Sequence, residues 1–155
     1  RDLHYPLRRQ RQMCIRDRQS KLNEGARAFR HGGGEFRIGD KVMQVKNNYD
    51  KGVFNGDMGL IEYIDAEKQQ LLVGFDSSVE YDAADLDELT LAYAISTHRS
   101  RGSEFPVVIL PLTTQHFVML QRNLLYTAIT RAKEMIVLVG TKQALGMAVQ
   151  NNEVA

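Results

Sequence analysis

Two clusters of polar residues hold most of the side chains in this sequence that could do chemistry. The first follows the apolar stretch LAYAI, and the second lies within YTAITRAKE. In the second cluster Thr127 and Arg131 are four residues apart, a spacing that would place both on one face of a helix. The members of the first cluster are Ser96, His98, Arg99, Ser100, Arg101, Gly102, Ser103 and Glu104.

Both clusters contain groups suited to binding an anion or a nucleotide. Gly102 would let backbone N–H groups come close to a phosphate. Arg131 offers a permanently charged, planar fork that matches phosphate oxygens. Glu104 can accept hydrogen bonds from hydroxyl groups such as those of a ribose.

Each of these residues also has a structural alternative, which is the commoner role for such a residue taken singly. His98 could be a hydrogen-bonded structural histidine, and Glu104 a solvated acid. Arg131 could form half of a surface ion pair with Glu134. Only the order and spacing of the two clusters favour a functional site.

From residue 91 the sequence alternates candidate strands with candidate helices. Such alternation predicts a parallel α/β sheet, in which ligands collect at the carboxyl ends of the strands. The run PVVILPL predicts a strand buried on both faces. The candidate strands are LAYAIS, PVVILPL and MIVLVG, and the candidate helices are LQRNLLYTAITRAKE and KQALGMAVQNN. The first helix would bury an apolar stripe formed by Leu124, Leu125, Ala128, Ile129 and Ala132.

The preceding part of the chain has a different pattern. Residues 36–90 contain several short candidate strands separated by turns, which predicts a small β-barrel. We expect Asn55-Gly56 to form a tight turn with a positive φ at the glycine. Residues 1–35 show no clear hydrophobic periodicity, and one short helix is expected around residues 20–29. Within them QMCIRDRQ resembles translated sequencing-adapter sequence, so we assign no function to Cys14 or the arginines beside it.

Composition excludes several classes of protein. The chain has 155 residues, of which 43% are hydrophobic and 25% charged, as in an ordinary globular protein. It has no apolar run near the ~20 residues that span a membrane, and its start lacks the apolar core of a signal peptide. A single cysteine excludes an internal disulfide and a cysteine-rich zinc site. We therefore expect a cytoplasmic protein with no membrane partner and no bound metal of its own.

Charge is distributed unevenly along the chain. Residues 1–31 hold nine Lys or Arg against three acids, whereas residues 57–88 hold ten acids and one base. Such asymmetry can mark a nucleic-acid partner. A solvated basic tail beside a solvated acidic surface is the alternative, and charge alone favours it.

The two clusters, taken in order, resemble motifs of a known family. AISTHRSRGSEFP resembles motif V, and NLLYTAITRAK motif VI, of the C-terminal motor domain of superfamily 1 DNA helicases, most closely the RecD/TraA-like group. FRIGDKVMQVKNNYDKGVFNGDMGLI is similar to the segment with which this group enters an SH3-like insertion domain. The resemblance runs from about Phe36 to Asn151. It implies an SH3-like β-barrel over residues 36–90, inserted in a partial RecA-like parallel sheet of the P-loop NTPase type, with residues 91–155 as the C-terminal part of the second motor domain.

The resemblance also implies roles for individual residues. Gly102 would approach the nucleotide phosphates, Glu104 would meet the ribose, and Arg131 would be the arginine finger for ATP hydrolysis. Single-stranded DNA would be contacted by Ser96, His98, Arg99 and Arg101. The family usually has His-Lys-Ser-Gln-Gly where this chain has His-Arg-Ser-Arg-Gly at residues 98–102, so the role of Arg101 departs most from the pattern.

No G-x-x-x-x-G-K-[ST] motif occurs, and neither does an acidic pair suited to Mg²⁺ after a strand. The resemblance implies that ATP and Mg²⁺ are bound mainly by an N-terminal RecA-like motor domain of the same full-length protein, and that this fragment alone is inactive and binds neither. It further implies 5′-to-3′ movement on single-stranded DNA, in repair, recombination or conjugation. The alternative is a non-catalytic module that binds single-stranded nucleic acid through the barrel, whose acidity argues against it. A third alternative is an unrelated phosphate-binding enzyme. Such an enzyme would need a nucleophile or an acid–base pair, and the sequence supports neither.

Overall fold

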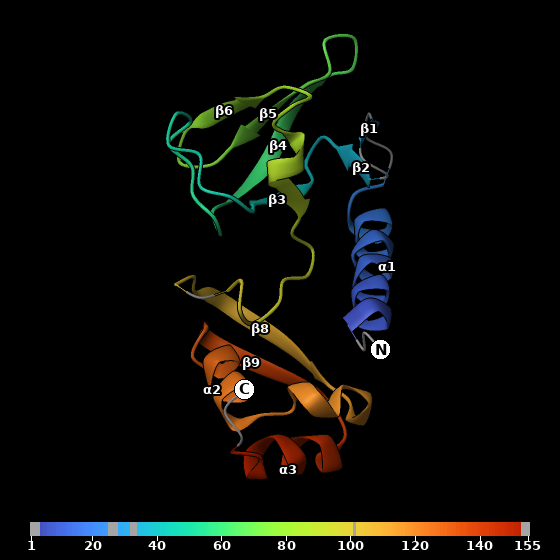
Figure 1. Cartoon of the computed structure of the whole chain (residues 1–155), viewed down its shortest axis with the longest axis vertical. Helices are drawn as coiled ribbons and strands as arrows, with labels where there is room; N and C mark the ends of the chain where they lie inside the picture. The colour runs from blue at the N-terminus through green and yellow to red at the C-terminus, as the bar shows by residue number, and fades with distance from the viewer. Residues whose placement is uncertain (1–3, 25–27, 32–33, 101, 153–155) are drawn as a thin grey trace. The chain divides into compact units, whose positions relative to one another are not determined.

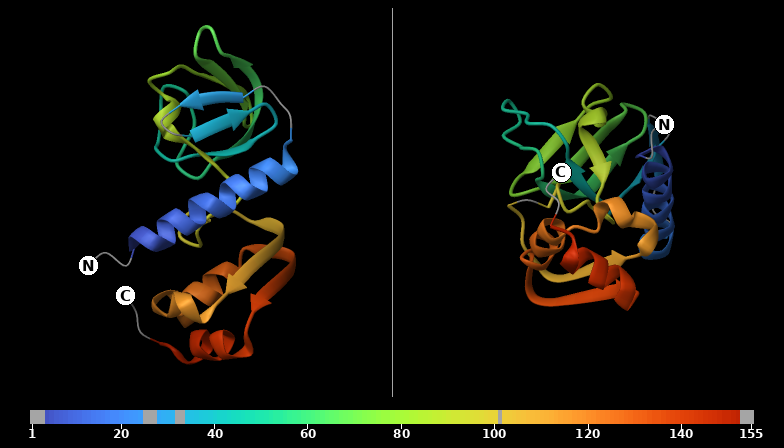
Figure 2. Two further views of the ribbon diagram at one scale, coloured as in Figure 1. Left: turned by 90° about the vertical axis from the view of Figure 1, so that its right-hand side faces the viewer. Right: turned by 60° about the horizontal axis from the view of Figure 1, so that its bottom comes forward.

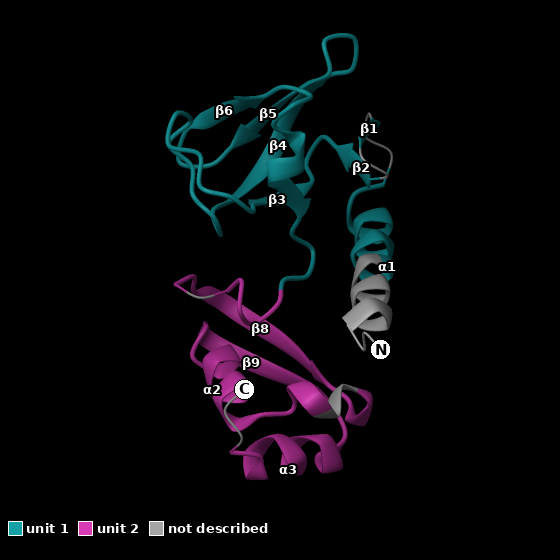
Figure 3. Cartoon of the chain, viewed as in Figure 1, with its two compact units in different colours: residues 1–95 teal, residues 96–155 magenta. Residues whose placement is uncertain are grey.

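The computed structural model describes residues 4–24, 28–31, 34–100 and 102–152. The chain divides into two compact units, unit 1 with residues 1–95 and unit 2 with residues 96–155 (Figures 1 and 3). Each unit is described by itself. None of the helices in the described ranges is long and apolar enough to cross a membrane.

Unit 1 begins with a helix and a hairpin. Helix α1 covers His4–Leu22, and strands β1 (Ala28–His31) and β2 (Gly34–Arg37) pair antiparallel. The expected short helix around residues 20–29 is therefore wrong, because the helix ends at Leu22 and residues 28–31 form a strand. Burial explains the difference: Phe29 and Phe36 lie opposite each other in the hairpin, and both are buried in the core of unit 1.

A five-stranded antiparallel sheet follows, formed by β3 (Lys41–Gln44), β4 (Met58–Asp65), β5 (Gln70–Gly74), β6 (Ser78–Tyr81) and β7 (Leu89–Leu91). The strand order is β6-β5-β4-β3-β7, and a short helix η1 (Leu86–Glu88) leads into β7. The predicted antiparallel strands are confirmed, but among the described residues β6 and β7 do not pair to close a barrel. These edge strands have only four and three residues, which leaves little backbone for closure.

Alternating side chains of the sheet make the core of unit 1. In β4 and β5 every buried residue is flanked by more exposed ones, the pattern of a sheet with one covered face. Figure 2 shows the β1–β2 hairpin against this sheet, and Phe29 and Phe36 join its core cluster. The turn at Asn55-Gly56 is confirmed: Gly56 has φ +105°, and the N–H of Asp57 donates to the carbonyl of Phe54 at 3.0 Å.

Unit 2 is a small α/β unit. Strands β8 (Phe105–Leu112) and β9 (Ala132–Gly140) pair in parallel. Between them lie a 3₁₀ helix, η2 (Thr114–Met119), and α2 (Arg122–Ile129); α3 (Lys142–Gln150) follows β9. Helix α2 packs on both strands, and α3 packs on α2 and η2. The core consists of Leu112, Leu120, Leu125, Ala144 and Ala148. The α/β class with a parallel crossover is thus confirmed.

Two details of unit 2 and the segment before it differ from expectation. The predicted strand LAYAIS is wrong, because Leu91 ends β7 in the antiparallel sheet and residues 92–96 are not in a strand. The run PVVILPL does form a strand, yet Val107 and Ile109 are 48% and 66% exposed. In the described part of unit 2 the parallel sheet has only two strands, so part of its apolar surface is not covered.

Candidate nucleotide and nucleic-acid site

The first polar cluster begins with a single helical turn. The carbonyl of Ser96 accepts hydrogen bonds from the N–H groups of Arg99 and Ser100, at 3.0 and 3.1 Å. Ser100 is buried, and its hydroxyl donates to the carbonyl of Thr97 at 2.7 Å. This turn leaves His98 and Arg99 exposed to solvent.

Gly102 turns the backbone towards β8. Its φ is +82°, in the left-handed region that favours glycine, while a Cβ at this position would meet nothing within 4 Å. Backbone conformation, and not lack of space, therefore requires the glycine. Ser103 donates its N–H to the carbonyl of Ser100 at 3.1 Å, which closes the loop. Arg101, predicted to contact DNA, lies outside the described residues.

Arg131 does not lie on a helix, contrary to prediction. Helix α2 ends at Ile129 with Thr130 as its C-cap, and β9 starts at Ala132. The expected helical face shared with Thr127 is therefore wrong, and the Thr127 hydroxyl instead donates to the carbonyl of Asn123 at 2.8 Å. The expected apolar stripe holds only in part: Leu125 and Ala128 are buried, whereas Ile129 is 41% exposed.

Arg131 nevertheless joins the two clusters. Its Nη1 donates to the carbonyl of Ser103 at 3.3 Å, and its own carbonyl accepts the N–H of Phe105 at 2.8 Å. Nη2 lies 3.4 Å from the Thr130 hydroxyl. Nε is buried and has no hydrogen-bond partner among the described residues. The ion pair with Glu134 is not found in the described part of the chain, so the guanidinium is held by neutral oxygens.

Glu104 lies beside a residue that sequence reasoning missed. Its carboxylate forms an ion pair with Lys133 at 3.3 Å, and both side chains are more than half exposed. Glu104 precedes β8 directly, and Lys133 is the second residue of β9. Glu104 and Arg131 thus each lie directly before the amino end of a parallel strand, β8 and β9 respectively, and not at the carboxyl ends where ligands were expected.

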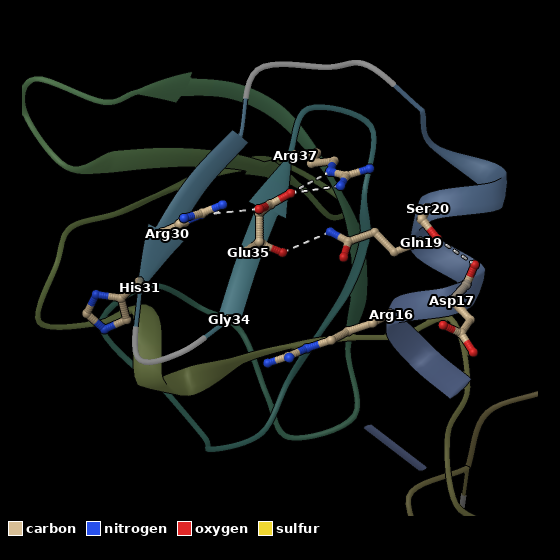
Figure 4. Close-up of a pocket in the computed structure, with 9 residues that line it drawn as sticks. All are labelled: Arg16, Asp17, Gln19, Ser20, Arg30, His31, Gly34, Glu35 and Arg37. Atoms are coloured by element: carbon tan, nitrogen blue, oxygen red, sulfur yellow. Dashed lines mark hydrogen bonds and ion pairs between the residues drawn. The ribbon is translucent and has the colours of Figure 1, made fainter. Parts of the chain in front are cut away.

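Unit 1 has a polar cavity of about 640 Å³ beside α1 and the β1–β2 hairpin (Figure 4). Its lining residues are Arg16, Asp17, Gln19, Ser20, Arg30, His31, Gly34, Glu35 and Arg37. Glu35 forms ion pairs with Arg37 at 2.8 Å and Arg30 at 3.4 Å. The hydrogen bond from Arg37 holds the pKa of Glu35 below its usual value. The sequence AFRHGGGEFR contains a signal for this hairpin, because a phenylalanine between polar or small residues stands on each side of the three glycines.

Comparison with family models places known domains on both parts of the chain. Residues 16–75 match the SH3 domain of ATP-dependent RecD-like DNA helicases, and residues 91–139 match the UvrD-like helicase C-terminal domain. The two matches follow each other in the order expected from the sequence.

Curated relatives agree with these matches. The chain is 41% identical over 131 residues to the ATP-dependent RecD2 DNA helicase of Deinococcus radiodurans, an alignment that covers 84% of this chain and 18% of that helicase. It is 29% identical over 119 residues to the RecD subunit of the RecBCD enzyme of Buchnera aphidicola subsp. Schizaphis graminum, covering 74% of this chain and 19% of that subunit. The chain therefore spans about a fifth of the length of these relatives.

Solved structures show the same fold. A Pif1 helicase structure describing DNA unwinding at forked double-stranded DNA has a TM-score of 0.62 at 22% identity, covering 86% of this chain and 38% of that one. Pif1 helicase from Bacteroides, in complex with ADP-AlF₃ and single-stranded DNA, has a TM-score of 0.59 at 19% identity, covering 84% and 38%. These neighbours confirm the α/β helicase fold with SH3-like antiparallel strands.

Proposed function

Since the chain belongs to the RecD-like superfamily 1 DNA helicases, as their SH3 domain joined to a UvrD-like helicase C-terminal domain, we propose that it is the C-terminal motor segment of an ATP-dependent DNA helicase. In this role it supplies contacts to single-stranded DNA and an arginine finger for ATP hydrolysis. The observation that carries the proposal is the environment of Arg131.

The contacts of Arg131 leave its guanidinium able to donate further hydrogen bonds, as an arginine that binds a phosphate group would need. A buried guanidinium donor without a partner costs free energy, and the unpartnered Nε is such a donor. The existing bonds of Nη1 and Nη2, at 3.3 and 3.4 Å, are long for a guanidinium and are weak restraints. A phosphoryl group that gains charge in the transition state would be bound better than either carbonyl or hydroxyl oxygen.

The neighbouring residues fit the rest of a nucleotide. Glu104 accepts hydrogen bonds from ribose hydroxyls once its carboxylate separates from Lys133, an exposed pair that costs little to break. The left-handed conformation at Gly102 turns the backbone, and glycine has no side chain that would keep a phosphate from the backbone N–H groups. The described residues hold no group of three metal-ligating side chains, so no step of this proposal is assigned to Mg²⁺ bound by this chain.

DNA contact is assigned to the turn that starts at Ser96. His98 and Arg99 are exposed there, and the cationic side chain of Arg99 suits a DNA phosphate. A neighbour of the same fold, Bacteroides Pif1, is described in complex with both ADP-AlF₃ and single-stranded DNA, which supports placing the two ligands on one motor. Movement in the 5′-to-3′ direction follows from the family resemblance alone.

The rest of the motor is assigned to a longer protein, which would hold an N-terminal RecA-like domain and the remaining strands of the second motor domain. Parallel sheets are normally covered on both faces, and β8 and β9 expose several large apolar side chains. These are Val107, Ile109, Met135, Val137, Leu138 and Val139. The share of RecD2 that the chain covers, 18%, leaves ample sequence for the missing strands and the ATP-binding loop.

A chimera tests the proposal directly. The 131-residue segment of Deinococcus RecD2 that aligns with this chain is replaced by the corresponding residues of this protein. We expect ATP hydrolysis stimulated by single-stranded DNA, together with unwinding of a substrate with a 5′ tail. A chimera that folds and binds single-stranded DNA like RecD2 but neither hydrolyses ATP nor unwinds would refute the function.

A further inference from the structure

Unit 1 contains a fully buried carboxylate, Asp40, to which the family resemblance assigns no role. Asp40 is 0% exposed and accepts four hydrogen bonds. The donors are Gln19 Nε2 at 2.6 Å, Asn23 Nδ2 at 2.7 Å, the backbone N–H of Arg37 at 2.7 Å and the Tyr93 hydroxyl at 2.8 Å. They come from α1 and the residue after it, from β2, and from the segment that follows β7.

These hydrogen bonds must stay in place together. Within the described part of the chain no cationic side chain forms an ion pair with Asp40, and the guanidinium of Arg37 is bound by Glu35 instead. A buried carboxylate without a counter-ion depends on its hydrogen-bond donors, because an unmet charge in the interior is costly. Asp40 therefore holds each donating segment in a defined position.

The Tyr93 hydroxyl belongs to the segment that leads into the Ser96 turn. Tyr93 is half-buried, and burial together with its hydrogen bond to Asp40 raises its pKa to about 12. The N–H of Ala92 donates to the carbonyl of Lys41 at 2.7 Å, which fixes the same segment from the backbone. Only two residues separate Tyr93 from Ser96, so ordering Tyr93 orders the start of the segment that leads to the turn.

We propose that Asp40, acting through Tyr93, is a positioning residue for the DNA contact at Ser96 and His98. It orders residues 92 and 93 before DNA binds, so that this part of the segment loses less conformational freedom on binding. The part of this inference that concerns DNA binding rests on the proposed function. Its structural half, the restraint of residues 92 and 93 by the Tyr93 hydroxyl, does not depend on that function.

The test removes one hydroxyl and nothing else. Tyr93→Phe keeps the ring and deletes the donor to Asp40, and Tyr63→Phe, at a 53% exposed tyrosine of β4, is the matched control. Hydrogen–deuterium exchange of the 155-residue chain is followed by mass spectrometry. Loss of a hydrogen bond to a charged group should speed exchange of the Ala92 N–H, which donates to the carbonyl of Lys41, by about tenfold in peptides that begin at or before residue 89. Peptides from β4 and β5 should be unchanged, and Tyr63→Phe should match the unmodified chain.

The same three proteins are then titrated with fluorescent single-stranded oligothymidine. We expect Tyr93→Phe to bind several-fold more weakly while Tyr63→Phe binds normally. Unchanged exchange at Ala92 overturns the restraint. Faster exchange with unchanged DNA affinity overturns the positioning role. No binding by the unmodified chain overturns the DNA contact assigned to this segment, whatever the exchange data show.

Discussion

Arg131 and Ser103 are 28 residues apart in sequence, yet the guanidinium of one donates to the carbonyl of the other at 3.3 Å. The contact joins the first polar cluster to Arg131, which lies in the two-residue segment between α2 and β9. A second bond, from the Phe105 N–H to the Arg131 carbonyl at 2.8 Å, fixes the backbone of Arg131 at the start of the parallel pair. The side chain can therefore move to a ligand while its backbone stays in place.

Replacing Arg131 by alanine in the RecD2 chimera should lower kcat for ATP by about 10²–10³-fold, because a donor to charge that develops in the transition state is lost. Arg131→Lys should not restore activity, since an ammonium group lacks the planar fork. Steady-state ATPase assays, thermal melting and DNA titration on the same proteins check this. Near-normal turnover in the alanine variant would refute the finger assignment.

The 155-residue chain by itself should hydrolyse no ATP, with or without single-stranded DNA. In the proposed function it supplies only the finger side of the nucleotide site, and no P-loop motif occurs in the sequence. Phosphate release by protein purified free of host helicases measures this, with the active chimera as positive control. DNA-stimulated turnover by the chain alone would contradict the division of the site between two motor domains.

Substituting Ser96 and His98 together by alanine in the chimera should weaken binding to single-stranded DNA and reduce stimulation of the ATPase by DNA. ATPase activity without DNA should persist, because neither side chain belongs to the proposed nucleotide site. Anisotropy titration and ATPase assays with increasing oligonucleotide separate the two effects. If binding and unwinding stay normal, His98 is a structural residue.

Unit 1 should lose stability in alkali through Tyr93. Its pKa rises from 10 to about 12 on folding, so between these values the folded state retains a proton that the unfolded state has released. The contribution is fully present below pH 10 and is lost as the pH rises towards 12. Denaturant titrations at several alkaline pH values should show a shallower decline for Tyr93→Phe, and an equal decline in both proteins would contradict the assignment.

Gly140 and Gly146 should respond oppositely to alanine. A Cβ at Gly140 would overlap the backbone carbonyl of Leu112, its partner across the parallel pair, whereas a Cβ at Gly146 in α3 meets nothing within 4 Å. Gly140→Ala should lower the free energy of unfolding by about 3 kcal/mol. Gly146→Ala should raise it by up to about 1 kcal/mol, since alanine favours helix. Denaturant titration checks both, and equal effects would contradict the register of β8 and β9.

The parts that sequence predicts well are those set by local pattern. The Asn55-Gly56 turn and the crossover between two apolar strands both follow from neighbouring residues. Distant pairing decides the rest. TRAKE reads as a continuation of α2, but pairing of Phe105 with Ala132 draws the chain into β9 and takes Arg131 off the helix. Likewise Leu91, the first residue of LAYAIS, pairs with Val42 and is the last residue of β7 in the antiparallel sheet.

Polar networks between segments are the hardest features to foresee. Gln19, Asn23 and Tyr93 each read as an ordinary polar or aromatic residue, and only the fold brings them to one carboxylate. The same holds for the ion pair between Glu104 and Lys133, which depends on the parallel register of β8 and β9. Neither arrangement has a spacing that a sequence motif records.

The bond between Asp40 and Tyr93 has a consequence for the nascent chain. Tyr93 is added 53 residues after Asp40, an interval of about 3–10 s at ordinary bacterial rates of translation. Until then the carboxylate lacks one donor, and for most of that time β3 lacks its neighbour β7. Unit 1 can therefore complete its hydrogen bonds only after synthesis has passed Tyr93 and that residue has left the ribosome, so the fold of this unit is completed late in its own synthesis.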